Sequence, residues 1–181
     1  MKNVVILGTI HLNWTPKEEL VEEIAKYSPD KIFIELTKKE VEEGKDNSIR
    51  DEMFNVLEYA KLNGVNYFLF DTDRDTFKAG VTGKEPGFNE YENKVKKLLS
   101  NYNWKDLNKQ EPWLEPKVNA LEEYLKNTYF DIEEMNKREE ELVANITSNL
   151  VEGVNVVVTG AGHINTYLEK IPNSIAPLRK K

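Results

Sequence analysis

Apolar residues in this chain form two patterns. Some occur in short continuous runs, and others recur at helical spacing over longer segments. Four continuous runs are rich in β-branched and aromatic side chains, and they predict strands: residues 4–7, 31–35, 65–70 and 155–159. Continuous runs, unlike alternating ones, indicate strands that are buried on both faces. Helical stripes separate the first three runs, at Leu20 to Tyr27 and at residues 41–62. Alternating strands and helices favour right-handed crossovers and a parallel sheet.

Helix starts and stops refine this pattern. Thr15 before Pro16, with Glu18 three residues after Thr15, predicts a capping box at the first helix. In the same way, Asp131 followed by Glu134 predicts the start of a long helix before the fourth strand. Further helices are predicted at residues 88–101, 117–127 and 164–170, with an edge strand at 174–178.

Residues 72–116 interrupt the alternation, and they combine glycine and proline with several aromatic side chains. Because aromatic residues argue against disorder, this segment is predicted to be an ordered insertion or lid after the third strand. The complete prediction is a single domain over residues 1–181. Its fold class is α/β, with three layers and a mainly parallel sheet of four to five strands flanked by helices.

Composition excludes several kinds of protein. The chain has 181 residues, a formal net charge of −7 and no cysteine. Without cysteine there are no disulfides, thiolate metal sites or cysteine nucleophiles. The acidic balance disfavours nucleic-acid binding, and the apolar runs are far shorter than the ~18 residues of a membrane span. The first residues do not resemble a signal peptide, so a cytoplasmic location is the default expectation.

One short pattern occurs twice, as Gly8-Thr9-Ile10-His11 and as Gly160-Ala161-Gly162-His163, and it contains both histidines of the chain. Each copy follows a predicted strand, at the edge of a parallel sheet where ligands bind. Glycine allows a sharp turn and a close approach to a ligand, so Gly8 and Gly160 are candidate binding positions. The alternative is that each histidine lies in the core or next to a helix start.

The second copy also suggests a dinucleotide site, but the pattern fails at two points. Asn165 stands where the third glycine belongs, and the chain ends before the required acidic residue. No nucleotide cofactor is therefore expected. An anion at the start of the following helix stays open.

Charged residues are expected at the same edge. Glu35 ends the second strand and is a candidate catalytic group, although a strand-end glutamate can also cap the next helix. After the third strand, Asp73 and Arg74 belong to a charged turn that either binds a ligand or forms internal ion pairs. Arg138 is a candidate anion clamp. Its spacing favours ion pairs with Glu134 and Glu141 on its own helix instead.

His11, His163 and Glu35 together match the ligand set of many open metal sites. Two imidazoles and one carboxylate suit a divalent metal such as zinc, manganese or cobalt, with water completing the coordination. Such a metal lowers the pKa of its bound water and polarises a carbonyl group.

These motifs, in this order, resemble the TraB family of pheromone-shutdown, GumN-type and Tiki proteins. The first match is the Gly-x-x-His motif followed by Pro29-Asp30 and a strand that ends in Glu35-Leu36. The second is a helix with Arg138, then a strand and the second Gly-x-x-His. The resemblance covers roughly residues 3–75 and 131–178 and implies a fold related to the erythromycin-esterase and ChaN-like proteins.

For the Tiki branch, the resemblance implies metal-dependent hydrolysis of peptides. It assigns key roles to three residues of this chain, His11, Glu35 and His163, and supporting roles to three others, Arg138, Asp73 and Arg74. A metal-dependent hydrolase acting on a peptide or small molecule is therefore the leading expectation. The alternatives are a protein that binds a peptide or small anion without catalysis, and a metal-free hydrolase of the esterase type. A homodimer formed through the aromatic insertion is a further expectation.

Overall fold

The computed structural model describes residues 1–10, 15–44, 50–82, 84–109 and 114–179. The strands are β1 (Lys2–Thr9), β2 (Lys31–Ile34), β3 (Asn66–Leu69), β4 (Gly153–Gly160) and β5 (Ser174–Ile175). The helices are α1 (Lys17–Ala25), α2 (Lys38–Glu43), α3 (Asp51–Leu62), α4 (Pro86–Leu99), α5 (Trp104–Leu107), α6 (Pro116–Tyr129), α7 (Ile132–Asn149) and α8 (Ile164–Lys170), with short 3-10 turns η3 (Ala161–His163) and η4 (Pro177–Arg179).

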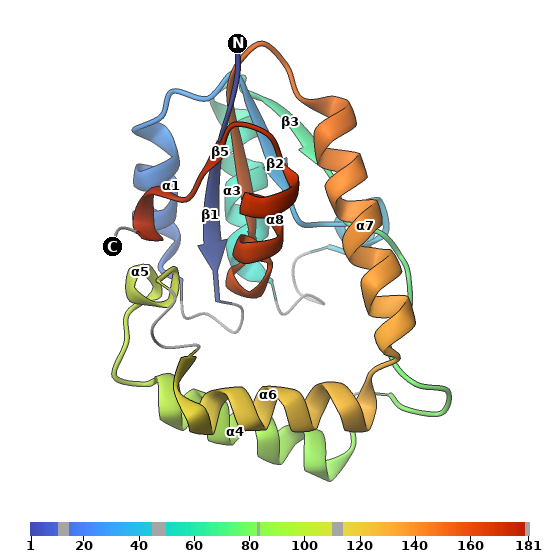
Figure 1. Cartoon of the computed structure of the whole chain (residues 1–181). Helices are drawn as coiled ribbons and strands as arrows, with labels where there is room; N and C mark the ends of the chain where they lie inside the picture. The colour runs from blue at the N-terminus through green and yellow to red at the C-terminus, as the bar shows by residue number, and fades with distance from the viewer. Residues whose placement is uncertain (11–14, 45–49, 83, 110–113, 180–181) are drawn as a thin grey trace.

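The strands form one parallel sheet in the order β3-β2-β4-β1-β5 (Figure 1). The last long strand, β4, lies between the first two and pairs with both, at Val5↔Val156 on one side and Phe33↔Val157 on the other. The predicted α/β class with a mainly parallel sheet is therefore confirmed. The insertion of β4 brings the ends of β1, β2 and β4 side by side.

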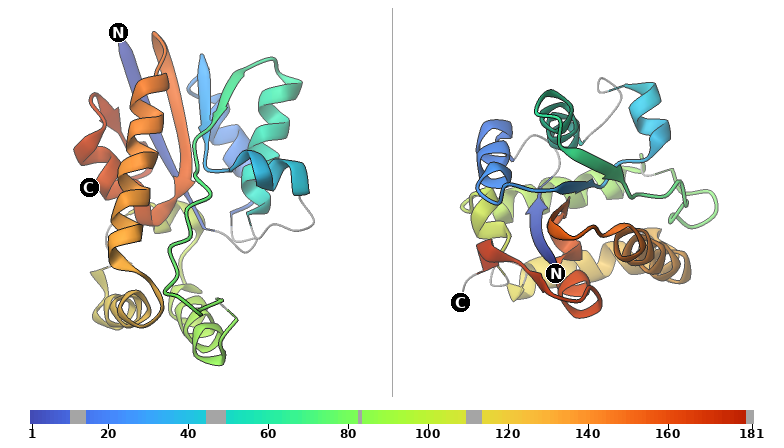
Figure 2. Two further views of the ribbon diagram at one scale, coloured as in Figure 1. Left: turned by 90° about the vertical axis from the view of Figure 1, so that its right-hand side faces the viewer. Right: turned by 90° about the horizontal axis from the view of Figure 1, so that it is seen from above.

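Helices cover both faces of the sheet, which gives the three predicted layers (Figure 2). Helices α1 and α3 pack on one face, where Ile32 and Ile34 point. Helices α7 and α8 pack on the other face, where Phe33 points. This alternation along β2 is the one expected of an extended strand. It also turns the next odd-numbered residue, Glu35, toward α7 and α8.

The described parts of the chain between β3 and α7 form an arm that crosses the carboxyl edge of the sheet. Helices α4 and α6 lie side by side there, beyond the tips of the strand arrows in Figure 1. The base of the arm is closed by backbone hydrogen bonds from Lys78 to Tyr129 and from Asp131 to Thr76. The predicted insertion of residues 72–116 therefore ends too early, because α6 belongs to the arm. We call the described residues within 77–130, which are 77–82, 84–109 and 114–130, the arm.

Asn108, which follows α5, ties the arm to β1. Its Oδ1 accepts a hydrogen bond from Gly8 N at 2.7 Å, and its Nδ2 donates to Gly8 O at 2.7 Å and to Trp104 O at 3.0 Å. The side chain is buried. A small apolar cluster of Leu99, Leu107 and Val118 lies beside this contact and includes Ile10 at its margin.

Several predicted helix boundaries are confirmed and two are wrong. Helix α8 begins and ends where predicted, and Asp131 caps α7 through the N–H groups of Glu133 and Glu134. Thr15 does not cap α1. Its hydroxyl accepts from Ile10 N and contacts Ile10 O, which ties it to the end of β1.

The second correction concerns the helical stretch predicted over residues 41–62, where the structure has two helices. Helix α2 is capped by a box between Thr37 and Glu40, and it ends at Gly44 with φ +87°. A positive φ favours glycine and stops a helix. In the described ranges, no helix combines the length and apolar character needed to cross a membrane.

Candidate functional site

The candidate site lies at the carboxyl edge of the sheet, where polar residues follow neighbouring strands. Glu35 comes directly after β2, Asp71 follows β3 by two residues, and Thr159 and Gly160 end β4. Because the strands are parallel, these ends meet on one edge. The side chains of Glu35 and Asp71 are only 3% and 2% exposed. Two carboxylates this deeply buried require partners.

Glu35 is held from several directions. Its Oε2 accepts hydrogen bonds from Thr159 Oγ1 at 2.6 Å and from Gly160 N at 2.7 Å. Its Oε1 lies 3.2 Å from Arg138 Nη2 and 3.5 Å from His163 Nε2. The alternative that Glu35 caps the next helix is wrong, because Thr37 is the cap of α2. Glu35 is therefore the centre of the cluster.

Arg138 reaches the site and does not pair with its helix neighbours. Its Nη2 and Nε contact Asp71 Oδ1 at 2.6 and 3.1 Å, and Nη2 also contacts Glu35. The neighbouring carboxylates on α7, Glu134 and Glu141, pair instead with Arg74. Despite partial burial, the charges and hydrogen bonds of Asp71 and Glu35 raise the pKa of Arg138. The guanidinium is thus a fixed positive charge at the edge of the sheet.

Arg50 is a second guanidinium of the site, and the sequence interpretation missed it. Its Nη1 donates to Asp71 Oδ2 at 2.7 Å and to the backbone oxygen of Glu35 at 2.8 Å, while Nε bonds Glu40. One signal was available. Only four of the 25 basic residues are arginines, and arginine is favoured where a planar, multidentate cation is required.

His163 ends the turn after β4, and both ring nitrogens and one face of its ring have neighbours. Nδ1 lies 2.6 Å from Glu139 Oε2, and Nε2 faces Glu35. The ring stacks on Tyr167, with centroids 5.6 Å apart. Burial alone would lower the pKa of His163, but the charge of Glu35 and the hydrogen bond to Glu139 raise it to about 10. The imidazole is therefore protonated at neutral pH.

Another buried carboxylate, on Glu52 of α3, lies at the end of β1. Glu52 is 2% exposed and accepts a hydrogen bond from Thr9 Oγ1 at 3.1 Å. Thr9 in turn lies 3.4 Å from the backbone oxygen of Thr159, whose hydroxyl bonds Glu35. This polar row links the ends of β1, β4 and β2. Helical spacing within α3 gave no signal for it.

The remaining candidates have other surroundings. Gly8 is enclosed, because an added Cβ would lie 2.6 Å from Ile164 Cδ1 and 2.9 Å from Ala161 Cα. Both peptide groups of Gly8 bind Asn108, so close packing accounts for this glycine. Gly160 donates its N–H to Glu35. Arg74 joins the charged turn to α7, and Asp73 is exposed. His11 lies outside the described residues.

A metal ion suits this cluster only in part. Two ligands about 2.1 Å from a tetrahedral ion lie about 3.4 Å apart, and His163 Nε2 and Glu35 Oε1 are 3.5 Å apart. Glu139 orients the imidazole as partners of metal-bound histidines do. Against this, the guanidinium groups of Arg138 and Arg50 lie 3.2 and 3.9 Å from the same Oε1. Among the residues that the structure describes, no group of three donors could hold a metal.

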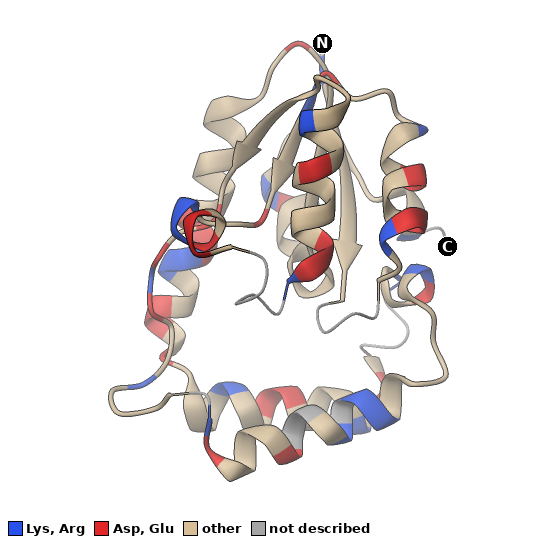
Figure 3. Ribbon diagram, turned by 180° about the vertical axis from the view of Figure 1, so that it is seen from behind, with Lys and Arg blue, Asp and Glu red and all other residues tan. Residues whose placement is uncertain are grey.

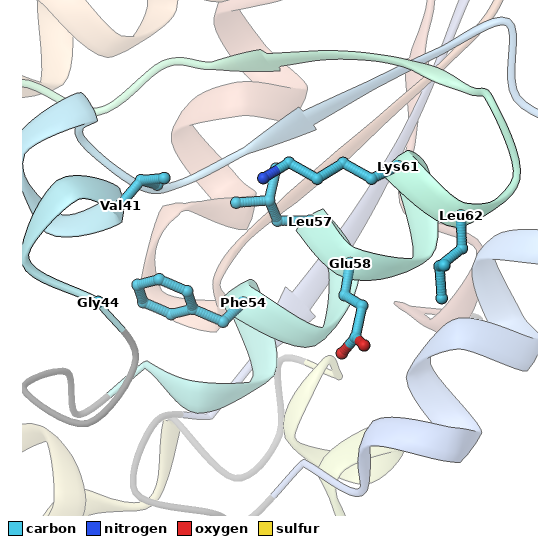
Figure 4. Close-up of a pocket in the computed structure, with 7 residues that line it drawn as sticks. All are labelled: Val41, Gly44, Phe54, Leu57, Glu58, Lys61 and Leu62. Carbon is cyan, nitrogen blue, oxygen red and sulfur yellow. The ribbon is translucent and has the colours of Figure 1, made fainter.

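A cavity of about 460 Å³ lies elsewhere, on the outer side of α2 and α3 (Figure 4). Its lining is mostly apolar, with one carboxylate and one amine: Val41, Gly44, Phe54, Leu57, Glu58, Lys61 and Leu62. None of the strand-end groups contributes to it. Acidic and basic residues are interspersed along the helices in Figure 3. Neither this cavity nor the distribution of charge along the helices marks the candidate site, which is identified by its buried ion pairs.

A scan against protein-family models, a search of curated proteins and a search of solved structures found no match to this chain. The resemblance to the TraB family stays a prediction that rests on the motifs.

Proposed function

We propose that this protein is a hydrolase whose reaction takes place at the carboxyl ends of β2 and β4, with His163 as the acid–base group. One observation carries the proposal. The imidazole of His163 is fixed between the carboxylates of Glu139 and Glu35, at 2.6 and 3.5 Å. A histidine oriented by a carboxylate at Nδ1, with Nε2 directed into a polar site, is the recurrent arrangement for proton transfer.

The proton balance follows from the charge state of His163. Since its pKa is raised to about 10, Nε2 carries a proton that can pass to a leaving oxygen or nitrogen atom. As water attacks, its oxygen bonds the substrate carbon, the bond from that carbon to the leaving atom breaks, and a proton from the water replaces the one that Nε2 has given to the leaving atom. The enzyme ends the cycle in its starting state, and the net reaction consumes one water.

Arg138 is the group proposed to stabilise negative charge on the substrate. Its side chain is 21% exposed, whereas the carboxylates of Glu35 and Asp71 beneath it are almost completely buried. A substrate at this edge therefore meets the guanidinium before the carboxylates. Preorganised donors of this kind stabilise an oxyanion that develops during attack by water. An ester or amide of a small molecule or peptide is the matching substrate class.

A metal-dependent hydrolase is the second candidate, and the spacing of His163 Nε2 and Glu35 Oε1 favours it. His11 would supply the third ligand. A bound divalent metal would polarise the substrate and supply hydroxide at neutral pH. In this version Arg138 would need to move away from Glu35 Oε1.

The test uses chelator-treated protein and a panel of chromogenic esters and peptide amides, with and without added zinc, manganese or cobalt. We expect turnover in the presence of chelator, and we expect His163→Gln to reduce kcat/KM by about 100-fold or more. Glu139→Gln should reduce it less, and Glu140→Gln, at the exposed neighbouring position, should not change it.

Three results would contradict the first candidate. Turnover that appears only with a metal selects the second candidate. Turnover that survives His163→Gln removes the proposed acid–base group. A ligand that raises the melting temperature but is never converted indicates a binding protein.

A further inference from the structure

Tyr167 lies one helical turn after His163, which puts the two rings on the same side of α8. The Tyr167 side chain is fully buried. Its ring is nearly parallel to the imidazole, with an interplanar angle of 18° and centroids 5.6 Å apart. The stack thus covers one face of the His163 ring.

Tyr167 is itself held in place by the core. Phe70 contacts its ring edge-on, with centroids 6.4 Å apart and an interplanar angle of 68°. Both residues belong to the apolar cluster between the sheet and α7 and α8. Phe70 directly precedes Asp71, so this chain of rings connects the end of β3 to His163. The support behind His163 is therefore part of the rigid core.

The hydroxyl of Tyr167 has fewer close partners than its ring does. In the described part of the chain no partner meets full hydrogen-bonding geometry, and the Thr159 side chain is a polar group that interacts with it. Burial, together with the charges of Glu35 and Glu139, raises the pKa of Tyr167 well above its usual value. The ring consequently stays neutral, and a neutral aromatic face attracts a neighbouring imidazolium.

The plane of the imidazole is restrained at two atoms of its edge, because Glu139 holds Nδ1 and Glu35 faces Nε2. The torsion that tilts this plane is rotation about the Cβ–Cγ bond of His163. A parallel ring packed on the imidazole face opposes this rotation directly. The stack therefore adds a restraint on the ring plane to those that the two carboxylates supply.

We propose that Tyr167 is a positioning residue, whose ring fixes the plane of the His163 imidazole so that Nε2 stays directed at Glu35. This inference rests on the proposed role of His163 as the acid–base group. It assigns the effect to the ring of Tyr167 and not to its hydroxyl.

The test compares Tyr167→Phe, which keeps a ring, with Tyr167→Leu, which removes it. Phe70→Leu is the matched control, since it removes a ring from the same cluster without touching His163. Imidazole signals in nitrogen-15 NMR spectra are easily assigned because the chain has two histidines, and His163→Gln identifies the relevant one. The measured quantity is hydrogen exchange of the Nδ1–H that bonds Glu139.

We expect wild-type protein, Tyr167→Phe and Phe70→Leu to show the same slowly exchanging Nδ1–H. Tyr167→Leu should exchange it about tenfold faster or more, while circular dichroism shows a folded protein. Where a substrate is known, kcat should fall at least about tenfold in Tyr167→Leu, with KM little changed, because misorientation of a reacting group lowers the rate.

Two results overturn the inference. One is an Nδ1–H signal in Tyr167→Leu that matches wild type. The other is an equal change in Phe70→Leu, which would indicate general loosening of the core. The NMR readout needs no turnover, so it remains decisive if the proposed function fails. Absence of turnover with an intact stack would count against the hydrolase alone.

Discussion

Two arginine side chains occupy different environments, although Arg138 belongs to α7 and Arg74 pairs with residues of that helix. Arg138 compensates Glu35 and Asp71, whose side chains are almost fully buried. Arg74 pairs with Glu134 and Glu141, which are 30% and 42% exposed. Removing one partner of a buried pair leaves an uncompensated charge in a poorly solvated place, whereas exposed partners are rescued by water.

The same substitution should therefore have different effects at these two positions. Arg138→Gln should lower the free energy of unfolding by about 3–5 kcal/mol. Arg74→Gln should lower it much less, because its carboxylates remain hydrated. Urea unfolding at neutral pH measures both losses. Equal losses would show that the burial of Glu35 and Asp71 does not determine how much Arg138 contributes to the free energy of unfolding.

His163 should make stability depend on pH in a defined window. Its pKa is about 10 in the folded protein, against 6.5 for an unperturbed imidazole. A raised pKa means that the folded state binds the proton more tightly, so the stabilisation is fully present below pH 6.5. It is lost progressively as the pH rises to about 10.

The check is a comparison of wild type with His163→Gln in chelator-containing buffer. The difference in unfolding free energy should shrink steadily between pH 6.5 and 10, since other groups titrate alike in both proteins. A difference that stays constant over this range would contradict the raised pKa.

The ion-pair partners of Arg138 could not be predicted from sequence spacing. Spacing favoured local pairs with Glu134 and Glu141, and this prediction is wrong because Arg138 pairs with Asp71, 67 positions away. Arg50 and Glu52 were missed for the same reason. Both residues are recognised by their burial beside strand ends. Burial of a polar residue on a helix does not alter the apolar periodicity of the sequence, so the sequence pattern does not reveal it.

At the level of elements, Gly8 of the first Gly-x-x-His motif and Gly162, the third residue of the second, differ in how closely they are packed. A Cβ on Gly8 would lie 2.9 Å from Ala161 Cα, a backbone atom that cannot easily move. A Cβ on Gly162 would meet nothing within 4 Å. Of these two glycines, Gly8 is therefore the one that close packing between β1 and residues 161–164 requires.

Gly8→Ala should destabilise the protein by about 1–3 kcal/mol, the usual cost of overpacking a core. Gly162→Ala should change stability by no more than about 0.5 kcal/mol. Thermal or urea unfolding of both variants makes the comparison. Two equally stable variants would mean that β1 and α8 separate easily to admit a side chain.

Strands and long helices were predictable because their signals are local. The β-branched run of residues 155–159 and the cap at Asp131 each decide an element within a few positions. Thr15 was misassigned because its hydroxyl accepts a hydrogen bond from Ile10 N, five positions earlier in the chain. Helix α5 was not predicted, since four residues give no periodicity.

At the scale of the whole molecule, the fold class followed from the alternation of elements, whereas strand order did not. The order β3-β2-β4-β1-β5 depends on where a long-range pairing forms, and β4 pairs with β1 across about 150 positions of sequence. That pairing and the pairing of β2 with β4 bring Thr9, Glu35 and Thr159 to one edge. The location of the candidate site at strand ends was predictable, but its network of partners required the fold.

Among the described residues, the arm has a smaller buried apolar cluster than either face of the sheet. Its buried apolar cluster contains Leu99, Leu107 and Val118 only, within the described residues, whereas the clusters on the two faces of the sheet are several times larger. Segments with few buried contacts open locally at a lower free energy than the whole protein. We therefore expect α4 and α6 to open while the sheet stays folded.

Hydrogen exchange followed by mass spectrometry tests this expectation. Amides of α4 and α6 should exchange faster than those of β1 and β4. Asn108→Ala should accelerate exchange in the arm further, because it leaves the buried peptide groups of Gly8 without a partner, at a cost of about 1–3 kcal/mol. Asn63→Ala, which removes an exposed side-chain hydrogen bond, is the control. If Asn108→Ala accelerates β4 as much as α4 and α6, the arm and the sheet unfold as one unit, and the substrate must enter without separate opening of the arm.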